Sequence, residues 1–84
     1  MVTKQQRMRS IRRLVRMLRG AQRDEKLSNH AMALRLGVSA SMLSMVYAGR
    51  RCPGRKFLSG VLRVFPQLYS EVYLFLLHER NGLT

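Results

Sequence analysis

Residue types that cross-link or rigidify a fold are scarce in this 84-residue chain. It has one cysteine, two prolines, no tryptophan and only four acidic residues. A single cysteine, Cys52, cannot form an internal disulfide or a Cys-x-x-Cys metal site, so the sequence is typical of an intracellular protein held together by packing. The most apolar segment, Val72–Leu77, is far shorter than the ~20 residues that a membrane span needs. No continuous apolar stretch follows the basic N-terminus, so we expect neither a signal peptide nor a membrane partner.

Side chains that carry catalytic or metal chemistry are few and scattered. His30 and His78 lie far apart and have no second ligand three or four residues away, whereas zinc needs several ligands at defined spacing. None of the four acidic residues stands beside a His, Cys or Ser in a recognisable catalytic motif, and no glycine-rich phosphate loop is present. We therefore expect no enzyme activity, no metal site and no cofactor.

The charge is strongly positive and unevenly distributed. Sixteen Lys and Arg residues give a formal net charge of +12, although 46% of the chain is hydrophobic, which argues against a disordered basic tail. Residues 1–26 hold nine basic and two acidic residues, residues 27–63 six basic and none acidic, and residues 64–84 one basic and two acidic. Because such charge on a folded chain repels itself, it indicates a polyanionic partner, with nucleic acid the leading candidate. The distribution predicts a basic working face on residues 1–63 and a neutral, apolar C-terminal end.

The apolar spacing predicts one all-α domain of five helices over residues 8–84, after a flexible basic arm over residues 1–7. The first helix has apolar residues at the i, i+3, i+4 and i+7 positions from Met8 to Leu18, with arginines on the complementary face. A fourth helix begins near Phe57, and Pro66 starts a fifth that runs to about residue 80. No strand-like alternation and no repeat is present.

Two short helices in the middle of the chain are separated by only three residues. Ser28 and Ser39 are suited to cap the helix N-termini, because a hydroxyl can accept from the free N–H groups of the first turn. Gly37 suits the left-handed position that ends the first of these helices. The side chains expected to pack between the two are Ala33, Leu36, Val38, Leu43 and Val46. This spacing is typical of a tight helix-turn-helix.

The central residues resemble the phage repressor and Cro family of helix-turn-helix DNA-binding domains. The resemblance covers about residues 10–68, and its specific motifs lie within residues 27–53. The residues that carry it are Leu27-Ser28, Ala33, Leu36-Gly37-Val38-Ser39, Leu43-Ser44, Ala48-Gly49-Arg50-Arg51, Pro53 and Leu58. It implies a compact five-helix, lambda repressor-like fold whose second and third helices form the motif, with Ala40–Ala48 as the recognition helix in the major groove.

The resemblance also implies which residues contact DNA. Base contacts fall to Ala40, Ser41, Ser44 and Met45. Phosphate contacts fall to Asn29, Ser39 and the loop after Gly49, where Arg50, Arg51, Arg55 and Lys56 lie. Further contacts are expected from the N-terminal basic residues Lys4, Arg7 and Arg9.

This chain departs from the family on the surface that faces the groove. Family members often place Gln, Asn, Lys or Arg there, whereas Ala40, Ser41, Ser44 and Met45 offer no bidentate donor set. Ala40 and Met45 could contact thymine methyl groups, and a serine hydroxyl can bond to a donor or an acceptor. We therefore expect binding to depend mainly on phosphates, DNA shape or arginines in a minor groove.

The C-terminal helix, residues 66–80, is apolar around most of its circumference. Leu68, Val72, Phe75 and Leu76 can face the domain core. The residues that extend the apolar surface beyond this face are Tyr69, Tyr73, Leu74 and Leu77. A helix that is apolar nearly all round is buried all round, which predicts an interface with a second copy. Coverage by the first helix or the arm is the alternative.

These features favour a cytoplasmic, nucleoid-associated regulator, encoded by a bacterium or a phage. The expected function is sequence-specific binding of double-stranded DNA by a homodimeric transcriptional repressor that reads an inverted repeat. One alternative is an antitoxin or accessory subunit whose C-terminal helix binds a different protein. Another is an architectural DNA binder of low specificity, which the small groove-facing side chains would fit. A membrane-active cationic peptide is supported only by the first helix.

Overall fold

The computed structural model describes the backbone of residues 4–82 and the side chains of residues 5 and 8–78, and the described chain is all helix and loop. Its elements in order are α1 (Lys4–Asp24), α2 (Asn29–Leu36), α3 (Ala40–Tyr47), α4 (Arg55–Val64), the 3₁₀ turn η1 (Pro66–Leu68) and α5 (Tyr69–Gly82). The expected all-α fold with five helices is confirmed for this part of the chain. No helix within residues 4–82 is long and apolar enough to cross a membrane.

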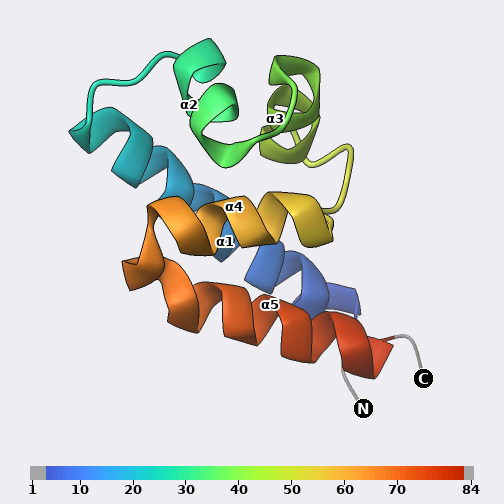
Figure 1. Ribbon diagram of the computed structural model, residues 1–84. Helices are drawn as coiled ribbons and strands as arrows, with labels where there is room; N and C mark the ends of the chain where they lie inside the picture. The colour runs from blue at the N-terminus through green and yellow to red at the C-terminus, as the bar shows by residue number, and fades with distance from the viewer. Residues whose placement is uncertain (1–3, 83–84) are drawn as a thin grey trace.

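The helices form a compact body in which α4 lies between α5 and the pair α2 and α3 (Figure 1). α1 packs mainly against α5, and these two helices run in opposite directions, so the start of α1 and the end of α5 lie at the same end of the molecule. α2 packs against both α3 and α4. This arrangement places α3 on the side of the molecule remote from α5.

The core collects apolar side chains from all five helices. The largest fully buried side chains are Leu14, Leu18, Met32, Leu36, Leu43, Val46, Phe57, Val61, Phe65 and Val72. The expected packing between the short helices is confirmed, because Ala33, Leu36, Leu43 and Val46 are buried and Val38 is half-buried against them. Since α2 and α3 have only eight residues each, this shared burial rather than intrinsic helicity holds them folded.

Capping fixes the ends of the short helices as the sequence indicates. The Ser28 hydroxyl accepts a hydrogen bond from the Ala31 N–H at 3.1 Å, and that of Ser39 accepts one from the Met42 N–H at 3.0 Å. Gly37 has φ +77°, the left-handed conformation in which a side chain would be strained. The turn between α2 and α3 is therefore set by two serines and one glycine.

The ends of the long helices differ from the sequence expectation. α1 begins at Lys4, so the flexible arm over residues 1–7 is wrong from Lys4 onward, and residues 1–3 lie outside the described chain. Residues 4–8 contain no glycine, proline or β-branched residue, so the helix extends beyond its apolar periodicity. Pro66 opens a 3₁₀ turn, and the α-helix starts only at Tyr69.

One core assignment in α5 is wrong. Leu76 is 47% exposed, whereas Leu68, Val72 and Phe75 are buried as expected. α5 packs mainly against α1 and also contacts α4, and this packing leaves Leu76 on the outside of the helix. Leu76 therefore belongs to the exposed apolar surface of α5.

Gly60 allows α4 to approach the C-terminal end of α2. A Cβ atom at Gly60 would lie 2.1 Å from the carbonyl oxygen of Leu36 and 2.9 Å from its carbonyl carbon. Both are backbone atoms, so no side-chain rotation can relieve the clash. Gly20 in α1, by contrast, has no atom within 4 Å of the corresponding position.

These two glycines form a matched pair for a stability test. We expect Gly60→Ala to lower the free energy of unfolding by about 1–3 kcal/mol through overpacking, despite the better helix propensity of alanine. Gly20→Ala should instead raise it by about 0.5–1 kcal/mol, because the propensity gain meets no steric cost. Urea denaturation followed by circular dichroism measures both. A Gly60→Ala protein as stable as Gly20→Ala would contradict the close approach.

Candidate nucleic-acid interface

The outward face of α3 carries the four residues expected to contact bases. Ala40, Ser41 and Ser44 are exposed. Met45 is 39% exposed, so its thioether reaches the surface, whereas Met42 is partly buried against the core. Together they form a narrow surface of small polar and apolar side chains with no charge.

The residues expected to contact phosphates lie at helix ends and in the loop that follows α3. Asn29, the first residue of α2, is exposed, and its Oδ1 accepts from Gln22 Nε2 at 2.8 Å. Ser39 is exposed at the start of α3, where its hydroxyl already accepts from Met42 N–H. The exposed basic side chains of the loop and the start of α4 are Arg50, Arg51, Arg55 and Lys56. They give positive charge near both the end of α3 and the start of α4.

Gly49 turns the chain sharply between α3 and this basic loop. Its φ is +76°, and the following Arg50 N–H donates to the Met45 carbonyl oxygen at 2.9 Å. This bond satisfies a carbonyl that the end of α3 would otherwise leave without a partner. The backbone of Arg50 is thereby fixed against the last turn of α3.

Of the three N-terminal basic residues expected to contact DNA, only Arg9 has a described side chain, and it lies beside α5. Lys4 and Arg7 belong to α1, and their side chains lie outside those described. Arg9 is exposed and shares a surface hollow with Leu74 and His78 of α5. The start of α1 therefore lies beside α5, at the end of the molecule away from α3 (Figure 1).

The outer face of α5 is apolar and open to solvent in the single chain. Tyr69 is 61% and Tyr73 53% exposed, and their rings stack with centroids 6.2 Å apart. Leu74 and Leu77 are each 40% exposed. All four residues expected at a dimer interface thus lie on the surface of one helix.

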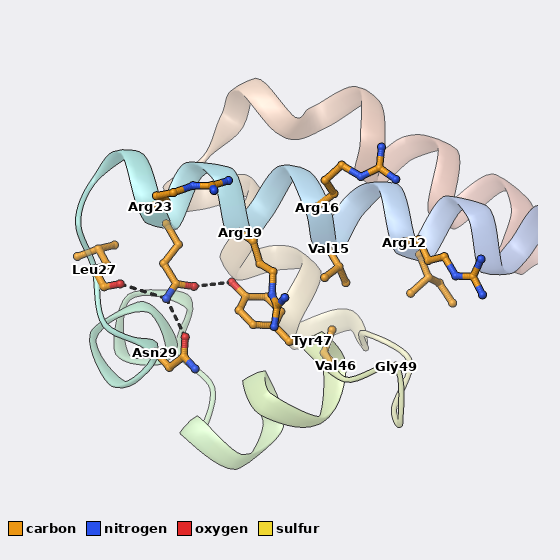
Figure 2. A pocket seen from close by; sticks show the side chains of 12 residues that line it. Arg12, Val15, Arg16, Arg19, Arg23, Leu27, Asn29, Val46, Tyr47 and Gly49 are labelled. Carbon is orange, nitrogen blue, oxygen red and sulfur yellow. Dashed lines mark hydrogen bonds between the residues drawn. The ribbon is translucent and has the colours of Figure 1, made fainter.

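A groove between α1 and the end of α3 was not anticipated from the sequence. We call it the α1–α3 groove, and it has a volume of about 720 Å³. Its arginines all come from α1 and are Arg12, Arg16, Arg19 and Arg23. Its apolar part is formed by Ile11, Val15, Leu27, Val46 and the ring of Tyr47. Figure 2 shows Arg12 and Arg19 pointing toward the α3 side of α1, and Arg16 and Arg23 lying along its upper side.

Tyr47 connects the two walls of the α1–α3 groove. Its hydroxyl donates to Gln22 Oε1 at 2.7 Å, and Gln22 Nε2 donates onward to the Leu27 carbonyl at 3.1 Å (Figure 2). The Arg19 guanidinium lies 4.8 Å from the centre of the Tyr47 ring, a cation–π geometry. Burial raises the pKa of Tyr47 to about 12, although the positive charge of Arg19 opposes the rise.

The sequence contained part of the signal for this groove. Arginines at positions 12, 16, 19 and 23 follow the spacing of one helix face, and solvation alone is an adequate reason for such a face. The missing information was that Tyr47, twenty-five residues beyond Gln22, bonds to it. No local pattern reports a contact of that separation.

The described residues contain no cluster suited to a metal ion. No group of three or more His, Cys, Asp or Glu side chains is close enough among them to hold one. Cys52 is exposed in the loop before α4.

Comparison with known proteins identifies no relative, because no family model, curated protein or solved structure matches the chain.

The raised pKa of Tyr47 predicts a pH dependence of stability. An unfolded tyrosine ionises near pH 10 and folded Tyr47 near pH 12, so its contribution is complete below pH 10 and is lost as pH rises toward 12. Between pH 9 and 11, wild type should lose about 0.5–1 kcal/mol more unfolding free energy than Tyr47→Phe, after allowing for solvent screening of a partly exposed ring. Urea denaturation at the two pH values measures this difference. Equal losses in the two proteins would show that Tyr47 ionises as it does in the unfolded chain.

Proposed function

We propose that this protein binds double-stranded DNA through α2, the turn Gly37–Ser39 and α3, acting as a helix-turn-helix, and that it regulates transcription as a homodimer. The observation that carries the proposal is the outward face of α3. It presents small side chains without charge on a helix held by a buried inner face, and exposed basic residues lie on the loop that follows it.

The dimensions of α3 suit the major groove of B-DNA. An α-helix with its side chains is about 10–12 Å across, and the major groove is about 12 Å wide and admits one α-helix. Small residues at Ala40, Ser41 and Ser44 let the helix axis approach the base edges closely. Met45 is the one long side chain on that face, and its apolar end suits a thymine methyl group.

Phosphate contacts supply most of the affinity in this proposal. A recognition face with two hydroxyls and no charged or amide side chain forms few bonds to bases, whereas each neutralised phosphate releases condensed counterions. The basic residues on the loop after α3 and at the start of α4 are positioned for this role. The backbone N–H groups at the start of α2 add a second anion-binding position beside Asn29.

The proposed dimer uses the outer face of α5. Residues 64–84 carry a formal charge of −1, so two copies can meet there without opposing their basic surfaces. Tyrosines combine an apolar ring with a polar tip and are enriched at interfaces. An isologous dimer presents two copies of α3 to half-sites of an inverted repeat about 34 Å apart.

Removing one loop arginine tests the phosphate role. With six to ten phosphates neutralised per dimer, log Kd should change with log salt with a slope of magnitude about 5–9. Arg50→Ala and Arg51→Ala should each reduce that magnitude by about 0.9 for every phosphate that the variant leaves without a cation, and weaken all DNA sequences about equally. Fluorescence anisotropy with duplexes selected from a random pool, titrated at several salt concentrations, measures both effects.

Arg13→Ala is the matched control because it removes the same charge from another surface. Arg13 Nε lies 3.7 Å from Glu71 Oε1, so this side chain faces α5 rather than α3. The slope should stay within error of wild type. Unchanged slopes for Arg50→Ala and Arg51→Ala would contradict the phosphate contacts, and a random pool without any enriched sequence would contradict sequence-specific binding.

The dimer is tested separately from DNA binding. Wild type should sediment as a dimer at high micromolar concentration, and the double variant Tyr73→Glu, Leu77→Glu as a monomer, because it places two carboxylates in the apolar interface. Leu34→Glu is the control, since Leu34 lies on α2 and is 75% exposed. A wild-type monomer, or equal effects of the two substitutions, would contradict an interface on α5.

A further inference from the structure

We infer that the α1–α3 groove is a binding site for an acidic amphipathic helix of a partner protein. The groove combines four arginines with an apolar floor, and none of its lining residues, all of which are described, is acidic. This site goes beyond the proposed DNA binding and uses different residues from the outward face of α3.

The groove exists because α1 and α3 are not packed closely against each other. α1 packs closely against α5, and α3 packs closely against α2. Tyr47 spans the remaining gap by its hydrogen bond to Gln22 and its contact with Arg19. The helices therefore stay apart, and Ile11 and Val15 remain only half-buried between them.

The shape of the groove suits a helix rather than a compact ligand. The arginines from Arg12 to Arg23 extend about 16 Å along α1, which is the length of three helical turns. Helices bind grooves by apolar residues spaced three and four apart, and Ile11 and Val15, one turn apart on α1, offer apolar surface at this spacing. Carboxylates on the partner helix would face Arg12 and Arg19, which point toward the α3 side of α1 (Figure 2), forming charge-assisted and partly bidentate bonds.

The apolar floor distinguishes this site from a surface for nucleic acid. A phosphodiester backbone gains its affinity from charge and hydrogen bonds, so it derives no benefit from the half-buried Ile11 and Val15. The Tyr47 ring is covered by the Arg19 guanidinium (Figure 2), which leaves it unsuited to stacking on a base. An acidic helix with an apolar face matches both the charge and the floor.

A synthetic peptide probe tests the inference on the full chain. The probe is a fluorescein-labelled 14-residue helix with glutamates on one face and leucines on the other, compared with a version in which glutamine replaces every glutamate. We expect the acidic probe to bind and to shift the ¹⁵N–¹H signals of Ile11, Val15 and Arg19, which line the groove from α1. The glutamine probe should bind about tenfold more weakly, because it lacks the charge-assisted bonds.

Two double variants with the same charge loss separate this site from the DNA surface. Arg12→Gln, Arg19→Gln should weaken the acidic probe about tenfold, and Arg51→Gln, Arg55→Gln by less than about twofold. Duplex DNA should show the opposite order. Because Arg19 contacts Tyr47, thermal denaturation checks that the first variant is folded, and single Arg12→Gln, which keeps that contact, should still weaken the acidic probe severalfold.

The outcomes distinguish failure of this inference from failure of the proposed function. Equal loss of peptide affinity in both double variants would overturn the groove as a site, since only general charge attraction would remain. DNA that shifts the groove signals and is weakened by Arg12→Gln, Arg19→Gln would assign the groove to nucleic acid instead. If Arg51→Gln, Arg55→Gln leaves DNA binding unchanged, the DNA surface is wrong, while the peptide result stands.

Discussion

The C-terminal end of α2 lies directly against the backbone of α4 at Gly60, and the position of α3 depends on this contact. α2 ends at Leu36, whose carbonyl group leaves no space for a side chain on the facing turn of α4. The left-handed Gly37 and the Ser39 cap then determine where α3 starts. Because α2 and α3 also share buried side chains, they move as one unit. A shift at Gly60 would therefore move both the outward face of α3 and the α3 wall of the groove.

Positive charge is the second constraint on this small body. The chain has a net charge of +12 and the Cα radius of gyration is only 12.3 Å, so the described basic side chains lie close together. Two of the few acidic residues connect separate elements: Glu71 of α5 pairs with Arg13, and Glu25, after α1, pairs with Arg35 at 3.2 Å. The first pair joins α1 to α5, and the second joins the end of α1 to α2. Much of the remaining described charge lies on the outer side of α1 and on residues 50–56, where the side chains are exposed and solvent screens their repulsion.

The helix pair α2 and α3 was largely predictable because its determinants are local. Serine caps, a left-handed glycine and apolar residues three and four apart all act within one or two turns, and the structure has each of them at the expected residue. The starts of α1 and α5 were less predictable, because the helix formers at residues 4–7 extend α1 before its apolar pattern begins, and Pro66 opens a 3₁₀ turn before α5. Leu76 shows a related difficulty. On a helix that is apolar on several sides, periodicity cannot identify which side faces the core, and the packing of α1 decides it.

The two candidate sites also differ in how far the local sequence predicts them. The exposure of Ala40, Ser41, Ser44 and Met45 follows from the burial of Leu43 and Val46 on the same helix, so it could be derived from α3 alone. The α1–α3 groove could not, because it depends on how far apart two helices lie that are distant in sequence. Hydrogen bonding from Tyr47 to Gln22 sets that distance, and neither residue belongs to a recognisable sequence motif. The arginines were visible from the start, but the apolar floor beside them was not.

That floor is what separates two basic surfaces that look alike by charge. Both the loop at residues 50–56 and the arginine row of α1 attract any polyanion at long range, and this attraction is screened by salt in the same way at each. What differs is the surface beneath the charges. Beside α3 it consists of small side chains, which in the proposed DNA complex would admit base edges, whereas in the groove it consists of branched aliphatic side chains and a tyrosine ring. Discrimination between partners therefore arises from apolar contact at short range, where charge alone makes no distinction.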